Sequence, residues 1–110
     1  MPFYLFQASY TPDALRAMVA KPQNREEGAR PLIEGIGGKL HHLFFCFGGD
    51  DIVALIEAPD DQAMAAGALA VGASGAFSAG RTTKLMSAAD AMKAMAGAQK
   101  AAANYKPATG

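Results

Sequence analysis

The order of strand-like and helix-like segments constrains this chain more than any other feature. Four runs of aromatic and aliphatic residues predict strands, at residues 3–10, 39–47, 51–58 and 76–86. Helical segments follow the first and third strands, whereas Gly48, Gly49 and Asp50 join the middle pair as a hairpin turn. Because 110 residues suffice for only one domain, we expect a single sheet covered by helices.

Two helix start signals lie between the first and second strands. Thr11 followed by Pro12 is typical of an N-cap with proline in the first helical position. Asn24 with Glu27 three residues later forms a capping-box pattern and predicts a second helix. Pro31 lies inside that second segment and is expected to kink the helix or delay its start.

Two further helices are predicted later in the chain. Residues 59–61, Pro-Asp-Asp, open a helix that we expect to reach about Ser74. Ser87 caps an Ala- and Met-rich helix that we expect to reach about Ala103. The resulting order is βαββαβ plus a C-terminal helix. It predicts an α+β, ferredoxin-like fold, a four-stranded antiparallel sheet with helices on one face.

Residues 1–86 are therefore expected to form the domain, and residues 87–110 a C-terminal helix and tail. Charge is divided unevenly along the chain. Residues 1–80 carry five basic and nine acidic groups, and the last thirty residues carry five basic groups against Asp90. The C-terminal helix is then either a solvated helix or one that packs on an acidic surface of its own or a neighbouring chain.

Both faces of the predicted sheet carry apolar side chains. In the first strand Phe6 and Tyr10 share one face, whereas Phe3 and Leu5 lie on the other, and the next two strands alternate in the same way. A face exposed to water is normally polar, so the second apolar face indicates an interface. We expect a homodimer or higher homo-oligomer with facing sheets. The alternative is that the C-terminal helix covers this face of its own chain.

Composition excludes several classes of protein. The net charge is zero with no cluster of Lys and Arg, so no nucleic-acid partner is expected. No run approaches the ~20 apolar residues of a membrane span, so no membrane partner is expected. Cys46 is the only cysteine, which fits a reducing compartment, and its aromatic neighbours predict a small buried side chain. Without a signal-peptide pattern, we expect a cytoplasmic protein.

The chain resembles the GYD-domain family over about residues 2–86. The resemblance rests on five segments, at residues 2–4, 37–40, 47–53, 57–61 and 80–83. The motif that names the family is Gly-Tyr-Asp or Gly-x-Tyr-Asp. Gly48 and Asp51 match it, but Asp50 stands where the tyrosine belongs, so any role of that tyrosine is absent here. The resemblance implies a bacterial protein of the dimeric α/β-barrel group that associates with itself. It implies no established reaction.

Pro2 and Asp51 form one candidate catalytic pair. We expect the first and third strands to lie side by side and parallel, so that their starts bring Asp51 beside Pro2 and the end of the fourth strand brings Lys84 there too. Such a cluster is either a structural ion pair or an acid/base site. With Met1 removed, the secondary amine of Pro2 would act as a base, as in tautomerases that begin with proline. This predicts a cofactor-independent isomerase or tautomerase, or a monooxygenase-type enzyme.

Two adjacent histidines are further candidates. On a regular strand His41 and His42 point to opposite faces and cannot bind one metal together, and His42 lies too far from Cys46 to share one. We therefore predict no metal site and no cofactor. His42 is a candidate catalytic residue and His41 a candidate ligand contact. Arg81 and Thr83 are either contacts for an anionic group or polar residues of an edge strand.

A binding function is the first hypothesis. Tyr4, Phe6, Tyr10 and His42 share one parity on neighbouring strands and are expected to line an aromatic cavity. The chain would then be a self-associating module for a small apolar or aromatic ligand. The enzyme described above is one alternative. The other is a structural subunit of a larger assembly, in which the C-terminal helix makes the contacts.

Overall fold

A computed structural model describes residues 1–109. Its strands are β1 (Phe3–Tyr10), β2 (Lys39–Phe45), β3 (Ile52–Glu57) and β4 (Phe77–Lys84). Its helices are α1 (Pro12–Ala20), α2 (Arg25–Gly35), α3 (Asp61–Ala73) and α4 (Ala88–Ala102). Each element lies within two residues of its predicted position, since its limits are marked by local signals.

The sheet is antiparallel throughout, with strand order β2-β3-β1-β4. The predicted α+β, ferredoxin-like fold is confirmed. The prediction that the first and third strands run parallel was wrong: Phe3 lies opposite Glu57, and Ala8 lies opposite Ile52. The helical crossover makes β2 parallel to β1, and the hairpin then reverses the chain, so β3 must run against β1.

Side-chain caps begin all four helices. Thr11, Asn24, Asp60 and Ser87 each accept a hydrogen bond from the backbone N–H three residues on. Each bond satisfies a donor that the first helical turn would leave free. Helix α2 begins directly after Asn24, so Pro31 does not delay its start.

Two glycines join α2 to β2. Gly37 has a φ of 82°, in the left-handed region that favours glycine at the end of a helix. A Cβ atom at Gly38 would collide with the backbone carbonyl of Glu57 on the neighbouring strand. The two glycines therefore allow a tight turn from the end of α2 into β2, close to the backbone of β3.

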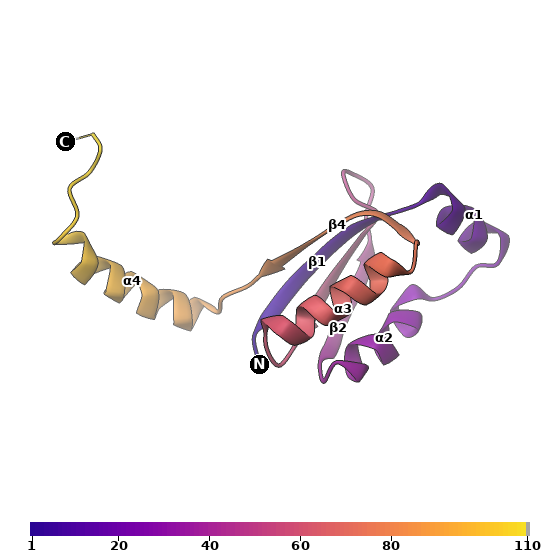
Figure 1. Cartoon of the computed structure of the whole chain (residues 1–110), viewed down its shortest axis with the longest axis horizontal. Helices are drawn as coiled ribbons and strands as arrows, with labels where there is room; N and C mark the ends of the chain where they lie inside the picture. The colour runs from indigo at the N-terminus through magenta and orange to yellow at the C-terminus, as the bar shows by residue number, and fades with distance from the viewer. Residues whose placement is uncertain (110) are drawn as a thin grey trace.

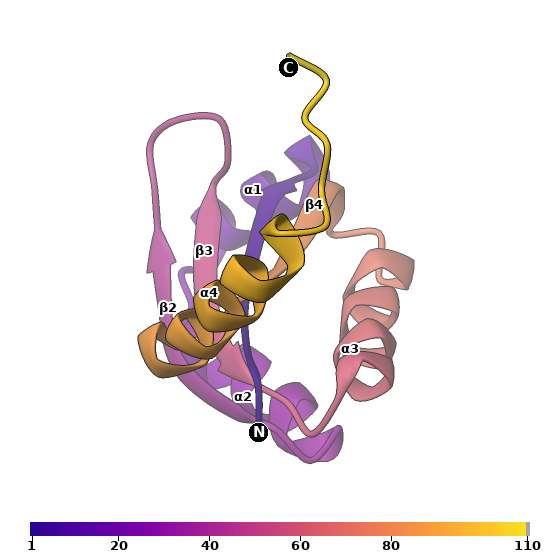
Figure 2. The ribbon, with the colours of Figure 1, turned by 90° about the vertical axis from the view of Figure 1, so that its left-hand side faces the viewer.

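Helices α2 and α3 lie on the same side of the sheet (Figures 1 and 2). Ile33 of α2 and Met64 of α3 pack on Tyr4, Leu40 and Ile56 of the sheet, and all of these side chains are buried. A smaller buried cluster consists of Ala8, Tyr10 and Ile52 near α1. Among residues 1–109, no helix lies on the opposite side of the sheet, called the open face below.

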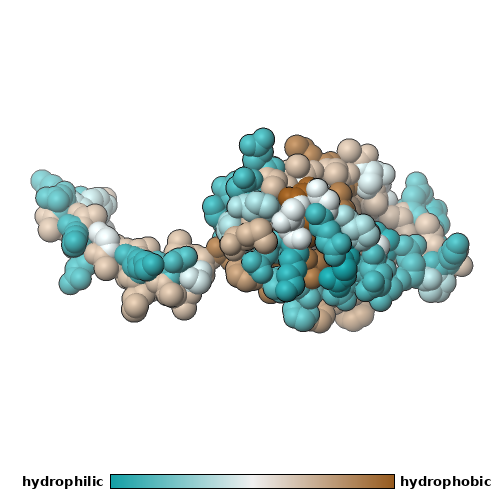
Figure 3. All heavy atoms as spheres, turned by 90° about the horizontal axis from the view of Figure 1, so that it is seen from below, coloured by the Kyte–Doolittle hydropathy of each residue, from teal (hydrophilic) through white to brown (hydrophobic). Residues whose placement is uncertain are grey.

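Helix α4 extends away from the rest of the chain (Figure 1). It has no buried residue, and the chain measures 60 × 32 × 21 Å along its principal axes. In Figure 3 the helix mixes hydrophilic and mildly apolar side chains, while the most apolar surface lies on the remainder of the chain. Helix α4 therefore does not cover the open face of its own sheet, where Phe3 and Phe44 remain exposed.

Candidate ligand-binding site

A β-bulge moves both histidines to the open face. Leu40 lies opposite Ile56 and His42 opposite Leu55, so His41 is the extra residue of β2. The His41 ring binds the Glu57 carboxyl group with Nε2 and Oε1 2.6 Å apart, and the His42 ring stacks on Phe44. The prediction that the two histidines point to opposite faces was wrong. His42 consequently does not join the aromatic residues on the helix-covered face.

Pro2 and Asp51 lie at opposite ends of the sheet. The N–H of Asp51 donates to the carbonyl of Ala8 at 2.9 Å, whereas the carbonyl of Pro2 accepts from the N–H of Ala58 at 3.2 Å. At about 3.3 Å per residue, the eight residues from Pro2 to Tyr10 separate these ends by roughly 25 Å. The predicted pair therefore does not form, because β3 runs antiparallel to β1. No site combines Pro2, Asp51 and His42.

Arg81 and Thr83 also lie on the open face. Their register partners on β1 are Gln7 and Leu5. The Arg81 guanidinium donates to the Asp50 carboxylate at 2.7 Å, so the charge predicted to hold an anion is already neutralised. Neither residue lines the apolar cavity between the sheet and helices α2 and α3, although Arg81 borders a separate hollow between β4 and α3.

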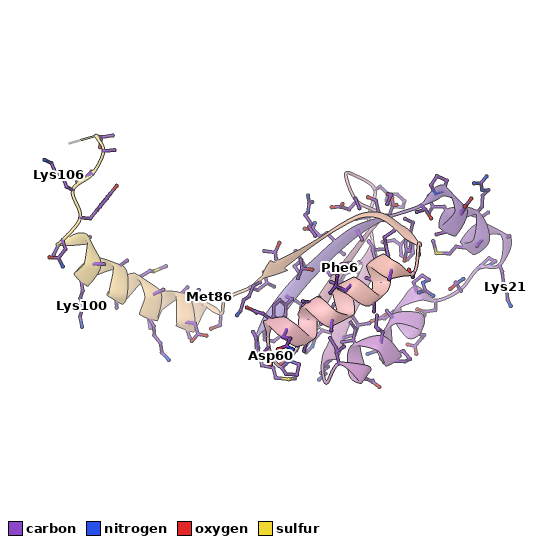
Figure 4. All side chains as sticks on the ribbon, in the orientation of Figure 1. Phe6, Lys21, Asp60, Met86, Lys100 and Lys106 are labelled. Atoms are coloured by element: carbon purple, nitrogen blue, oxygen red, sulfur yellow. The ribbon has the colours of Figure 1, made fainter. Side chains whose placement is uncertain are left out.

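An apolar cavity of about 110 Å³ lies between the sheet and helices α2 and α3. Phe6 projects into this space from β1, as its place in Figure 4 shows. Other lining residues come from each neighbouring element: Leu32 and Ile33 of α2, Ile52 and Ala54 of β3, and Met64 and Ala68 of α3. Phe77 of β4 packs edge-on against Phe6, with ring centroids 6.0 Å apart.

Tyr10 and Arg25 are the polar lining residues of the cavity. Tyr10 is only 6% exposed, and its ring stacks on Phe77 with centroids 4.7 Å apart. Burial raises the pKa of the Tyr10 hydroxyl, and the Arg25 guanidinium beside it opposes that rise. Phe6 and Tyr10 thus lie where the sequence predicted a cavity. Arg25 was missed, because nothing in the sequence indicates that the residue after the Asn24 cap turns back towards Tyr10.

Tyr4 lies in a neighbouring groove between α3 and β4, not in this cavity. Its hydroxyl donates to Asp61 Oδ1 at 2.5 Å, and Lys84 Nζ lies 2.9 Å from the same oxygen. The hydrogen bond to Asp61 is the main cause that raises the pKa of Tyr4 to about 12. The bonds from Tyr4 and Lys84 lower the pKa of Asp61. Sequence analysis gave Asp61 only a role in opening α3, since the contact depends on the crossing of α3 over the sheet.

The described residues lack both a cluster of metal-ligating side chains and a membrane-spanning helix. Across residues 1–109 there is no group of three or more His, Cys, Asp or Glu side chains arranged to hold a metal ion. None of the helices in that range is long and apolar enough to cross a bilayer.

Cys46 is half-buried in the hairpin, where its thiol donates to the carbonyl of Asp50 at 3.1 Å, so it is less buried than predicted.

The four-stranded antiparallel sheet, with a cavity beneath its helices, defines a ferredoxin-like α+β protein. The family model of the GYD domain matches residues 4–95, so the chain belongs to the GYD domain family, as the sequence resemblance predicted.

Comparison with solved structures supports the fold. The crystal structure of MtbAldR (Rv2779c) is similar, with a TM-score of 0.54, 19% sequence identity, and coverage of 78% of this chain and 52% of that one. This chain thus spans about half the length of MtbAldR, and the likeness concerns the fold alone. A comparison with curated proteins finds no match.

Proposed function

We propose that this chain is a self-associating subunit that binds a small apolar or aromatic molecule in the cavity between the sheet and its helices. The observation that carries the proposal is the cavity itself, which is apolar except for Tyr10 and Arg25. An ordered water needs two to four polar partners, and among residues 1–109 Tyr10 and Arg25 are the only polar side chains that line the cavity, so its interior favours an apolar occupant.

The size of the cavity suits one ring. An apolar cavity of about 150 Å³ in another protein stays dry and takes up benzene, and the volume here is about 110 Å³. Small shifts of Met64, whose side chain is unbranched and adaptable, would enlarge it. Phe6 and Phe77 present an edge-to-face aromatic wall, to which a further ring can be added in the same geometry.

The open face supports pairing with a second copy of the chain. Leu5 of β1 lies directly opposite Leu55 of β3 on the two central strands, and Phe44 is 60% exposed beside them. Polar pairs lie towards the edges of this face, an ion pair of Arg81 with Asp50 and a hydrogen-bonded pair of His41 with Glu57. An apolar centre with a polar rim is the usual anatomy of a protein interface. The partner best matched to such a face is the same face of another copy.

A binding experiment tests the cavity. We expect toluene to shift the backbone amide NMR signals of Ile52 and Ala54, which lie on the cavity floor. The variant Ala68→Leu places a larger side chain in the cavity from α3 and should abolish these shifts. Ala66→Leu makes the same change on the exposed side of α3 and should leave them intact. Absence of shifts in the natural chain, or equal shifts in both variants, would contradict the proposal.

One observation favours a second candidate function, that of a structural subunit in a larger assembly. Helix α4 has no buried residue, and Met92 and Met95 on it are each 67% exposed. Met86, which leads into this helix (Figure 4), is 63% exposed. Exposed methionines on a helix provide an adaptable surface for another chain. Loss of assembly on removal of residues 87–110, with ligand binding unchanged, would favour this function.

A further inference from the structure

We propose that the ligand of the cavity carries an anionic group, and that the chain binds small aryl or short-chain acyl carboxylates. In this arrangement the apolar part occupies the cavity, and the carboxylate is held by the Arg25 guanidinium and the Tyr10 hydroxyl. The inference rests on the proposed binding function and gives the chemical class of its ligand.

The first argument is that the charge of Arg25 has no carboxylate partner. The other three arginines are paired, Arg16 with Asp13, Arg30 with Glu26 and Arg81 with Asp50. Arg25 instead donates to the neutral side-chain oxygen of Gln23 at 2.6 Å, and no ion pair of Arg25 occurs within the described part of the chain. A half-buried cation beside an apolar cavity is further stabilised by an opposite charge, which a carboxylate supplies.

The second argument is the position of the guanidinium. Its atoms lie against Gly28, where a Cβ atom would be 2.5 Å from the nearest of them. Arg25 therefore folds back across the first turn of α2 and borders the cavity. A guanidinium presents a planar set of donors that binds carboxylates through two parallel hydrogen bonds.

The third argument is the meeting of two hollows at this point. A second hollow, of about 390 Å³, is lined by α1, α2 and the end of α3. It shares Tyr10 and Arg25 with the cavity, together with Leu32, Val71 and Phe77. A ligand whose ring lies in the cavity would thus place its polar end at the Tyr10 hydroxyl, towards the wider and more open space.

The Asp51 charge acts on the Tyr10 hydroxyl, as the smallest of the causes that shift its pKa. The Asp51 carboxylate already accepts the Tyr10 backbone N–H at 2.9 Å. Asp51 therefore does not neutralise Arg25, and the positive charge remains available at the junction of the two hollows.

The test compares phenylacetate with 2-phenylethanol, which keeps the ring and replaces the carboxylate by a neutral alcohol. Affinities are measured by NMR titration of the full chain. A hydrogen-bonded charge pair corresponds to roughly 10- to 100-fold in affinity, so phenylacetate should bind that much more tightly. Arg25→Gln should remove the preference for phenylacetate over 2-phenylethanol. Arg25→Lys should retain part of it. Arg16→Gln, a change to an exposed arginine, should have no effect.

Gly28→Ala gives an independent test that keeps the charge and does not weaken the helix. Its added methyl group displaces the guanidinium, so the preference for phenylacetate should fall several-fold, while alanine favours the helical conformation of α2. Equal binding of the two compounds to the natural chain, or a preference that survives Arg25→Gln, overturns the carboxylate inference and leaves cavity binding intact. If neither compound binds, both proposals fail.

Discussion

Replacing Leu5 by aspartate should separate the proposed dimer. Leu5 lies at the centre of the open face, on one of the two central strands and opposite Leu55. Burial of a leucine side chain contributes about 1.5–3 kcal/mol, and the lower value applies here because Leu5 is already half-buried in a single subunit. A two-fold interface contains the residue twice, so the loss is about 3 kcal/mol. This weakens association roughly 100-fold, before any cost of two facing charges.

Sedimentation velocity over a range of concentrations measures this change. The natural chain should sediment as a dimer at concentrations where the Leu5→Asp variant sediments as a monomer. Val19→Asp is the matched control, since Val19 is 80% exposed on α1, away from the open face, and the same substitution should leave association unchanged. A natural chain that stays monomeric at the highest concentration, or a Leu5→Asp variant that dimerises equally well, would refute the assignment of the interface.

Four further outcomes are expected from the structure. Because the pKa of Tyr4 is raised to about 12 in the folded chain, its contribution to stability is complete below pH 10 and lost as the pH rises through 12. Tyr4→Phe should therefore reduce the loss of stability in that range, measured by circular dichroism. The pKa of Asp61 is lowered, so Asp61→Asn should reduce the loss of stability as the pH falls below about 4. Gly38→Ala should destabilise the chain by about 1–3 kcal/mol in urea unfolding, because its Cβ meets backbone, whereas Gly48→Ala, which meets no atom within 4 Å, should change little. Deletion of residues 87–110 should leave the melting temperature of the remaining chain nearly unchanged, since α4 buries no residue, and a large fall would show that α4 stabilises the fold.

The sequence predicted those features that depend on neighbouring residues. All four cap residues lie within a few positions of the donors they bind, so the helix starts could be found without knowledge of the fold. Strand alternation also placed Phe6 and Tyr10 together on one face of the sheet, and in the structure both line the cavity on the helix-covered face. Local patterns were sufficient in these cases because both partners of each interaction lie in one segment.

Features that join distant segments were missed. A single extra residue at His41 changes which face the following side chains occupy, and no composition signal marks it. The contact of Tyr4 with Asp61 depends on how α3 crosses the sheet, and the approach of Arg25 to Tyr10 depends on how α2 does. The Pro2–Asp51 site was wrong for a simpler reason, since strand direction follows from the connections and not from the residues.

The bulge in β2 also affects whether the edge strands of the sheet can pair with strands of other chains. Strands β2 and β4 are its two outer strands, and each has a row of backbone groups with no neighbour on one side. Such rows invite strand-by-strand addition of other chains and, in the end, fibrils. The irregularity at His41 interrupts that row on β2. On β4, the charged side chains of Arg81 and Lys84 disfavour pairing with a strand of another chain. Uncontrolled polymerisation is thereby discouraged at the edges, while the apolar face between them stays free for ordered contact.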